Sequence, residues 1–144
     1  MNLRAIVAQL QNCPCGRVHD VAIDDVRIER GLVHRAGEVL LENNFPRRIL
    51  LVADDNTLRA ADGITASLAL CGYQFDLRRY ENLRTAHMQQ VDQIAAQLAG
   101  YDGVLSIGTG SLNDICRLAA YKADVPFAIF ATAPSMDGFA SCTA

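Results

Sequence analysis

Several features that would define a protein class are missing from this chain of 144 residues. It has no tryptophan, only three histidines and a formal net charge of -3, with no long run of lysine or arginine. Nucleic acids are bound by concentrated basic faces, so we expect no nucleic-acid partner. No apolar run approaches the roughly 20 residues that cross a bilayer, and the amino terminus lacks a secretory pattern. We therefore expect a cytoplasmic protein that does not bind membranes.

The five cysteines are scattered and odd in number, so they cannot all be joined in one disulfide framework. Reduced thiols are the simpler interpretation. Cys13, Cys15 and His19 lie in the pattern C-P-C-G-x-x-H, which offers three metal ligands. A structural zinc normally has four ligands at wider spacing, so we favour a turn packed on its own small side chains and keep the metal role as the alternative.

What the chain does contain is 51% apolar residues, enough for the core of one domain. Short apolar runs alternate with segments of helical spacing from about residue 48 onward. We expect strands at 49–53, 73–77, 104–107 and 127–131, each followed or preceded by a helix, and two earlier helices over 3–10 and 32–43. The runs LLVA, VLSI and FAIF fit strands buried on both faces.

This alternation predicts an α/β fold, a parallel Rossmann-like sheet flanked by helices and joined by right-handed crossovers. The helix after the first strand is expected to begin at Thr57 and to carry Ile64, Leu68 and Cys71 on its apolar face. His34 and His87 fall on expected helices and are interpreted as surface residues. In such sheets ligands gather at the carboxyl ends of the strands, so the loops there are the candidate sites.

Two aspartates, Asp54 and Asp55, follow the first strand directly. A carboxylate at this place can accept hydrogen bonds from ribose hydroxyls, and its charge disfavours a phosphorylated ribose, which leans toward NAD over NADP. The same residues together with Asn56 can instead cap the helix that follows. We weigh the two roles evenly, and each aspartate can serve one of them.

A glycine turn, Gly108 to Asp114, joins the third strand to its helix. The backbone N–H groups of Gly110 and Ser111 would face a pyrophosphate at the start of that helix. The alternative is a tight strand-to-helix turn, because the usual dinucleotide pattern has three glycines after the first strand. Asp114 near the helix start also complements the helix dipole.

A second polar loop, residues 132–141, follows the last strand and carries Thr132, Ser135, Asp137 and Ser141. Asp137 has no neighbouring carboxylate or histidine that would complete a catalytic set, so we interpret it as a residue that orients a polyol. The alternative is a cap for a helix starting near Gly138. The chain stops soon afterwards, which leads us to expect a fragment of a longer protein.

The chain resembles one enzyme family at GTGSLNDICRLAAYKADVPFAIFATAPSMDGFAS, with support from LLVADDNT and Gly63. The family is the sn-glycerol-1-phosphate dehydrogenase branch, the AraM-like proteins, of the superfamily of iron-dependent alcohol dehydrogenases, glycerol dehydrogenase and dehydroquinate synthase. The resemblance implies that 1–144 is the N-terminal NAD(P)-binding domain of the dehydroquinate synthase-like fold. Residues 1–47 would form lead-in helices and a short strand, and 48–144 the βα units, without the helical C-terminal metal-binding domain.

The resemblance also implies a reaction: NAD(P)-dependent interconversion of sn-glycerol 1-phosphate and dihydroxyacetone phosphate, a step of phospholipid metabolism. A divalent metal, zinc or nickel, would assist, held by one aspartate and two histidines that lie beyond this chain. By this resemblance Gly110, Ser111 and Asp114 would bind the pyrophosphate, and Asp54 or Asp55 the adenosine ribose. Further cofactor contacts would come from Gly108, Thr132, Ser135 and Ser141, and the substrate contact from Asp137. Thr109 replaces the middle glycine that the family usually has.

From these features we expect a homo-oligomeric enzyme whose fragment does not turn over alone. Two alternatives remain: a non-catalytic nucleotide-binding module, and a dehydroquinate synthase-like or other polyol dehydrogenase chemistry on the same fold. The preferred hypothesis requires that the turn at Gly110 and the bend at Asp137 border one crevice, because a dinucleotide has to touch both.

Overall fold

The computed structural model describes residues 8–10, 13–17 and 23–134. The chain divides into two compact units, Met1–Leu32 and Val33–Ala144. In the first unit residues 8–10 are helical, in agreement with the end of the expected opening helix, whose other residues lie outside the described ones. Ser135, Asp137 and Ser141 lie outside them as well, so their expected roles stay predictions.

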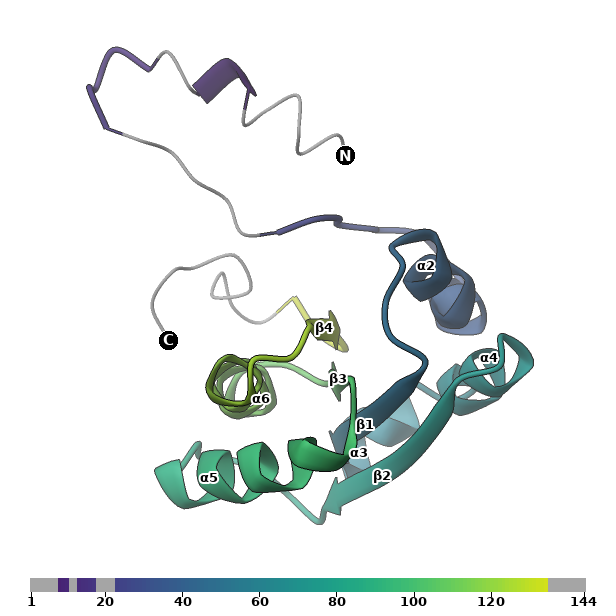
Figure 1. Cartoon of the computed structure of the whole chain (residues 1–144). Coiled ribbons are helices and arrows are strands. Elements are labelled where there is room, and N and C mark those ends of the chain that lie inside the picture. The colour runs from purple at the N-terminus through teal and green to yellow at the C-terminus, as the bar shows by residue number, and fades with distance from the viewer. Residues whose placement is uncertain (1–7, 11–12, 18–22, 135–144) are drawn as a thin grey trace. The chain divides into compact units, whose positions relative to one another are not determined.

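The second unit is built on a four-stranded parallel sheet (Figure 1). Its strands are β1 (Arg48–Asp54), β2 (Gln74–Tyr80), β3 (Gly103–Ile107) and β4 (Phe127–Phe130), in the spatial order β2-β1-β3-β4. β1 pairs with β2 from Arg48 opposite Gln74, and with β3 from Ile49 opposite Gly103. The predicted parallel α/β fold is confirmed.

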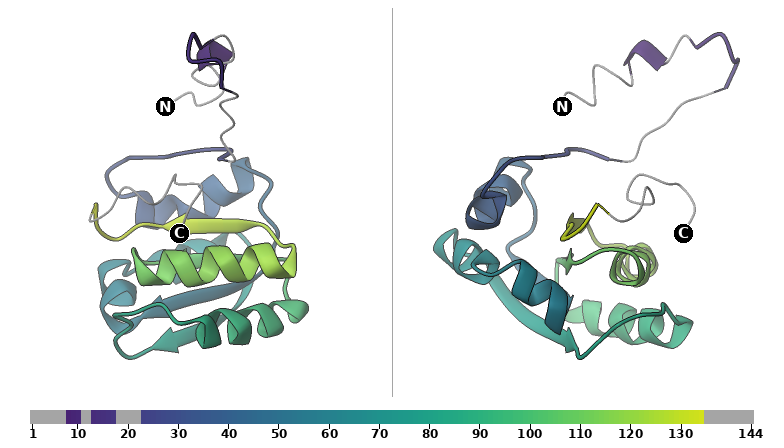
Figure 2. Two further views of the ribbon diagram at one scale, coloured as in Figure 1. Left: turned by 90° about the vertical axis from the view of Figure 1, so that its left-hand side faces the viewer. Right: turned by 180° about the vertical axis from the view of Figure 1, so that it is seen from behind.

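Helices cover both faces of this sheet (Figure 2). They are η1 (Leu32–Arg35), α2 (Ala36–Glu42), α3 (Asp55–Ala60), α4 (Ile64–Leu70), α5 (Met88–Gln97), η2 (Leu98–Gly100) and α6 (Ser111–Ala123). One core cluster joins Ile49, Leu51 and Ala53 of β1 to α2 and α4, while the other joins Leu50 and Val52 to α5 and α6. Side chains of a strand alternate between faces, which is why an unbroken apolar run such as LLVA fits the middle of a two-sided core.

The helix expected to run unbroken from Thr57 to Cys71 is in fact two helices, so this prediction was wrong. α3 already begins at Asp55, and Ala61–Gly63 separate it from α4. Gly63 has φ 95° and ψ -12°, a left-handed conformation that ends regular helix and that glycine adopts without steric cost. The break turns the chain, so that α4 packs on α2.

The outer strands also differ from expectation. β2 runs to Tyr80, three residues beyond its expected end, because those residues pair with β1 as far as Asp54. β4 is only half-buried throughout, so the expectation that FAIF is buried on both faces was wrong. In the described part of the chain β4 pairs only with β3, which leaves it at the edge of the sheet. No helix in that part is long and apolar enough to span a membrane.

α2 and α4 approach each other closely at Gly37. Its N–H donates to the Ser67 hydroxyl at 3.0 Å in a buried contact. A Cβ atom at Gly37 would lie 2.5 Å from the Ser67 carbonyl oxygen and 2.8 Å from the Cys71 sulfur. The sequence therefore needs glycine here for packing, since a methyl group has no space.

Candidate functional site

Between β1 and β3 the order in which strands are added to the sheet changes direction. From β1 the chain goes to β2 on one side, and it then crosses to β3 on the other side. In open α/β sheets the crevice at such a switch point, outside the carboxyl ends of the two strands, is where ligands bind. Here it lies between the end of β1 at Asp54 and the end of β3 at Ile107.

Gly108 joins three of the predicted loops at this edge. Its N–H donates to the carbonyl oxygen of Phe130, the last residue of β4, at 3.0 Å. A Cβ atom on Gly108 would lie 3.2 Å from the Thr57 Cγ2 atom and 2.4 Å from the Leu112 Cδ1 atom. The glycine turn therefore lies directly against the start of α3 and against the end of β4.

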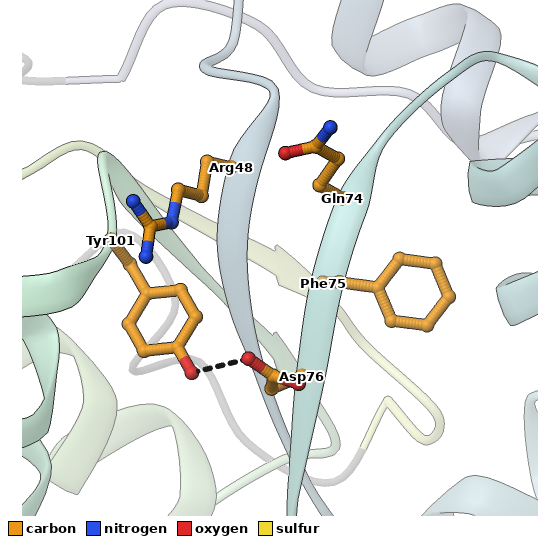
Figure 3. A pocket seen from close by; sticks show the side chains of 5 residues that line it. All are labelled: Arg48, Gln74, Phe75, Asp76 and Tyr101. Carbon is orange, nitrogen blue, oxygen red and sulfur yellow. Dashed lines mark hydrogen bonds between the residues drawn. The ribbon is translucent and has the colours of Figure 1, made fainter.

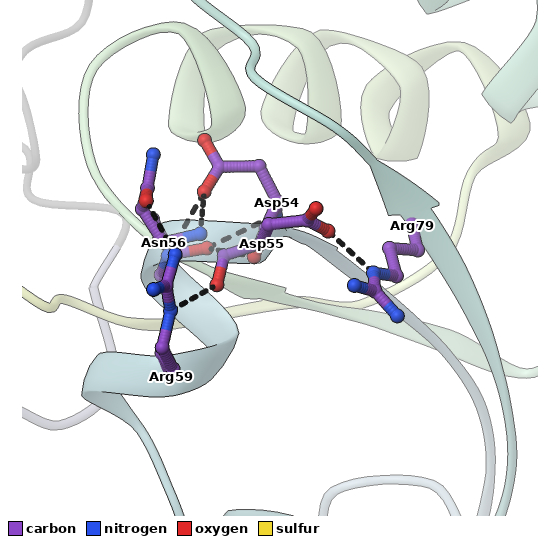
Figure 4. A network of polar contacts seen from close by, with 6 residues as sticks. Asp54, Asp55, Asn56, Arg59 and Arg79 are labelled. Carbon is purple, nitrogen blue, oxygen red and sulfur yellow. Dashed lines mark hydrogen bonds and ion pairs between the residues drawn. The ribbon is translucent and has the colours of Figure 1, made fainter.

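Asp54 is the N-cap of α3 (Figure 4). Its Oδ1 accepts hydrogen bonds from the N–H groups of Asn56 and Thr57, both at 2.9 Å. The Thr57 hydroxyl in turn accepts from the Asp54 N–H at 3.0 Å, which completes a capping box. Asp54 is only 6% exposed, so its carboxylate is largely committed to the helix start.

Asp55 is placed differently from its neighbour. Its carboxylate forms an ion pair with Arg79 near the end of β2, and its side chain keeps 31% of its surface exposed (Figure 4). The hydrogen bond from Arg79 lowers the pKa of the Asp55 carboxyl below its usual value. Asp55 lines an open hollow of about 370 Å³ whose other lining residues are Leu58, Arg59, Asp62 and Arg79.

The hollow beside Asp55 is therefore bordered by both signs of charge. Arg59 lies on α3 and donates to the Asn56 side chain at 2.9 Å. Arg79 comes from a part of β2 that the sequence pattern did not assign to the strand, so its role was missed. The sequence offered one indication of this role, the pair of arginines after Leu77. Such a pair is equally typical of a solvent-exposed segment that follows a strand.

The glycine turn ends in the first residues of α6. Gly110 has φ 50° and ψ -119°, which favours glycine, and it precedes a helix of 13 residues. The Ser111 hydroxyl donates to the carbonyl oxygen of Arg84 at 3.0 Å, and the Asp114 N–H donates to the carbonyl oxygen of Gly110 at 3.0 Å. Amides in the first turn of a helix have no carbonyl partner within it, and they carry the positive end of the helix dipole.

Asn113 is a second residue that sequence reasoning missed. It is fully buried in the first turn of α6, and its Nδ2 donates to Asp114 Oδ1 at 3.1 Å. Its Oδ1 atom is buried and finds no hydrogen-bond partner among the described residues. Such an atom is costly unless something satisfies it, and a bound group or water at this edge would do so. An asparagine between Leu112 and Ile115 in an apolar helix was the available signal.

The remaining predicted residues are placed only in part. Thr132 follows β4 by two residues and is half-buried, at the same edge as the glycine turn. His34 and His87 are exposed, as predicted, and His87 is the N-cap of α5 rather than part of the helix. Within the ranges that the structure describes, no three His, Cys, Asp or Glu side chains are grouped to hold a metal.

A second hollow lies at the opposite, amino-terminal edge of the sheet (Figure 3). It measures about 290 Å³ and is lined by Arg48, Gln74, Phe75, Asp76 and Tyr101. The Tyr101 hydroxyl donates to Asp76 at 2.6 Å, which raises the tyrosine pKa, and the Arg48 guanidinium lies 5.9 Å from the ring centre. These groups satisfy one another, and the edge is the wrong one for a switch-point ligand.

The fold and the carboxyl edge define a Rossmann-like α/β domain with a glycine turn at its switch point. The chain belongs to the iron-containing alcohol dehydrogenase family, whose model matches residues 27–144. It is 31% identical over 137 residues to glycerol-1-phosphate dehydrogenase [NAD(P)+] of Halalkalibacterium halodurans, covering 90% of this chain and 34% of that protein. It is 32% identical over 115 residues to the protein of the same name from Methanothrix thermoacetophila, covering 79% and 32%.

Solved structures agree on the fold. Glycerol dehydrogenase from Schizosaccharomyces pombe superposes with a TM-score of 0.62 at 18% identity, over 74% of this chain and 27% of that one. A 2-epi-5-epi-valiolone synthase from Streptomyces hygroscopicus, with NAD+ and Zn2+ bound, gives 0.53 at 24% identity, over 77% and 34%. The sheet and helices match the N-terminal domain of these proteins. The chain spans about a third of the length of the curated relatives it matches.

Proposed function

We propose that this chain is the NAD(P)-binding half of a metal-assisted oxidoreductase that interconverts sn-glycerol 1-phosphate and dihydroxyacetone phosphate. The observation that carries the proposal is the position of Gly108, which is hydrogen-bonded to the end of β4 and packed against Thr57. It brings three loops to one switch point. Family membership and relatives named glycerol-1-phosphate dehydrogenase over most of the chain support the reaction.

The dinucleotide pyrophosphate would lie at the start of α6. The first-turn amides, including that of Ser111, would donate to its oxygens, and the backbone of Gly108 and Gly110 would lie against them. The orphaned Asn113 Oδ1 lies in the same turn and is consistent with a bound group nearby. Asp114 would contribute indirectly, because its carboxylate accepts a hydrogen bond from the side-chain amide of Asn113 and so fixes the orientation of that amide.

The adenosine ribose would be bound by Asp55, while Asp54 holds α3 in place. Asp55 keeps a partly exposed carboxylate at the hollow, whereas the Asp54 carboxylate accepts hydrogen bonds from two amides at the helix start. Arg79 and Arg59 beside Asp55 offer guanidinium donors to a phosphorylated ribose. We therefore propose that the domain accepts both NAD and NADP, with Asp55 favouring the first.

Thr132, Ser135 and Ser141 complete the proposed cofactor contacts, and Asp137 the substrate contact. When bound, the nicotinamide supplies or accepts the hydride. The described residues offer no metal site of three ligands, so this chain's own part is to bind and orient the cofactor. We further propose that residues 1–144 form the N-terminal domain of a cytoplasmic, homo-oligomeric enzyme.

Calorimetric titration of the chain with NADH, NADPH and AMP tests the binding. We expect both dinucleotides to bind more tightly than AMP, because only they reach the glycine turn. Addition of Zn2+, NADH and dihydroxyacetone phosphate should give no turnover. A chain that binds none of these nucleotides, or that turns over substantially by itself, would contradict the proposal.

A further inference from the structure

The loop between β2 and α5, residues 81–87, lies against the start of α6. The Ser111 hydroxyl donates to the carbonyl oxygen of Arg84 at 3.0 Å in an exposed contact. Leu83, directly before Arg84, is partly buried and packs against the core cluster that contains Leu112 of α6. Two neighbouring residues of the loop are therefore fixed beside the first turn of this helix. None of the residues to which the sequence motif gave a role lies in this loop.

Arg84 differs from the two other arginines that follow Leu77. The Arg78 guanidinium donates to three side chains of β2 and α5, and the Arg79 guanidinium is paired with the Asp55 carboxylate. Arg84 is exposed, and among the residues that the structure describes its guanidinium has neither a carboxylate nor another hydrogen-bond acceptor as a partner. Its positive charge is thus available to a ligand at the carboxyl edge of the sheet.

The start of α6 carries no cationic side chain of its own. The charged side chain of its first turn is Asp114, which is negative. A pyrophosphate bound there would gain from the free amides and the helix dipole, but it would also face this carboxylate. A guanidinium offsets such repulsion, because it donates paired hydrogen bonds to phosphate oxygens. The buried Asn113 Oδ1 atom in the same turn, unpartnered among the described residues, is a second sign that a further group completes this helix start.

We propose that Arg84, held beside α6 by the Ser111 hydroxyl, binds the pyrophosphate of the dinucleotide. The ligand group is a diphosphate ester, so the inference rests on the proposed function and adds a binding residue to it. Ser111 has two tasks in this arrangement. Its backbone amide donates to the diphosphate, and its hydroxyl positions the loop that carries the guanidinium.

Calorimetric titration of the full chain with ADP, AMP and NADH tests the contact of Arg84 with the diphosphate. The unsubstituted chain should bind ADP more tightly than AMP, because only ADP has two linked phosphates. Arg84→Gln should weaken binding of NADH and ADP by about tenfold and bring the affinities for ADP and AMP close together. Arg84→Lys keeps the charge but not the paired donors, so its affinities should lie between the two.

Salt dependence and a matched control separate charge from fold. High salt should weaken NADH binding more in the unsubstituted chain than in Arg84→Gln, because salt screens the attraction that the variant lacks. Arg48→Gln removes the same charge from an exposed residue at the amino-terminal end of β1, and it should bind NADH as the unsubstituted chain does. Thermal unfolding should show equal melting temperatures for Arg84→Gln and the unsubstituted chain.

Ser111→Ala tests the positioning step, since it removes the hydroxyl and keeps the backbone amide. NADH affinity should fall several-fold when Arg84 is present and should not fall further in the Arg84→Gln background, because both changes act through one contact. A further fall in that background would show that the hydroxyl binds the ligand directly, and it would overturn the positioning role.

The two levels of the proposal fail in different ways. If the unsubstituted chain binds NADH and ADP, and Arg84→Gln binds them equally well, the inference about Arg84 is overturned while the proposed function stands. If the unsubstituted chain binds neither nucleotide, both are overturned.

Discussion

The two adjacent aspartates give the sharpest test of the site, because the structure assigns them opposite tasks. Asp54→Ala removes the acceptor for two amides at the start of α3. Loss of an N-cap costs about 1 kcal/mol and up to about 2. Asp54 is 6% exposed, so we expect a cost in the upper part of this range. For a domain of this size that corresponds to a fall in melting temperature of roughly 3–8 °C. Asp54→Asn keeps a capping oxygen and should lose much less.

Asp55→Ala should behave in the reverse way. Its ion pair with Arg79 is exposed, and such pairs contribute little to stability, so the melting temperature should stay close to that of the unsubstituted chain. Affinity for NADH should fall by about tenfold, as expected for loss of one charge-assisted hydrogen bond to the ribose. Affinity for NADPH should fall less or rise, because Arg79 is released to a phosphate.

Thermal unfolding and calorimetric titration with NADH and NADPH, on the same preparations, measure both effects. Asp92→Ala is the matched control, since Asp92 also forms an exposed ion pair, with Lys122 at 2.7 Å on the surface of α5 and α6. It should change neither stability nor cofactor binding. The assignment is refuted if Asp54→Ala leaves the melting temperature unchanged, or if Asp55→Ala binds the two dinucleotides in the original ratio.

Three further outcomes follow from the described contacts. Gly37→Ala should lower the free energy of unfolding in urea, because overpacking against Ser67 costs about 1–3 kcal/mol and helix propensity returns at most about 1; Gly100→Ala, which has open space, should not destabilise. Burial raises the pKa of the Cys116 thiol from 9.0 to about 12. The folded state, which holds this thiol neutral, is therefore not penalised below pH 9, and it loses stability as the pH rises from about 9 to about 12, where the unfolded chain ionises the thiol. In Cys116→Ala, the free energy of unfolding measured by urea titration should fall less over that pH range. Gly110→Val should abolish NADH binding in calorimetry while the circular dichroism of the helices is retained, since valine strains the left-handed turn; unchanged binding would remove the turn from the site.

Strong periodicity made most of the fold predictable. β1 and β3 carry apolar runs that tertiary packing does not override, and both were confirmed within a residue or two. A helix was expected after the glycine turn, and α6 confirms it, although it already begins at Ser111, inside the segment predicted as the turn. The break at Gly63 was not predictable from periodicity, because the apolar spacing continues on both sides of it. The extension of β2 was missed because its last residues are polar, and pairing with β1 rather than apolar burial holds them.

The sequence predicted which loops form the candidate site, but not which residue in a loop holds the fold and which one is free to contact a ligand. The position of Asp54 and Asp55 after an apolar strand pointed to a cap and to a ribose contact equally. Only the observed start of α3 at Asp55, two residues before the expected start at Thr57, shows that Asp54 is the cap. Asn113 was missed because it stands next to Asp114, and two adjacent polar residues in a helix are typical of a surface position, whereas Asn113 is fully buried.

The central place of β1 has a consequence for biosynthesis. Both strands that flank it come later in the chain, and one edge stays open until residues 103–107 have left the ribosome. Every residue of β1 after Arg48 is buried in the finished fold. A long apolar strand is thus left with one unpaired edge during synthesis, and we expect yield in cells to depend on chaperone capacity during translation.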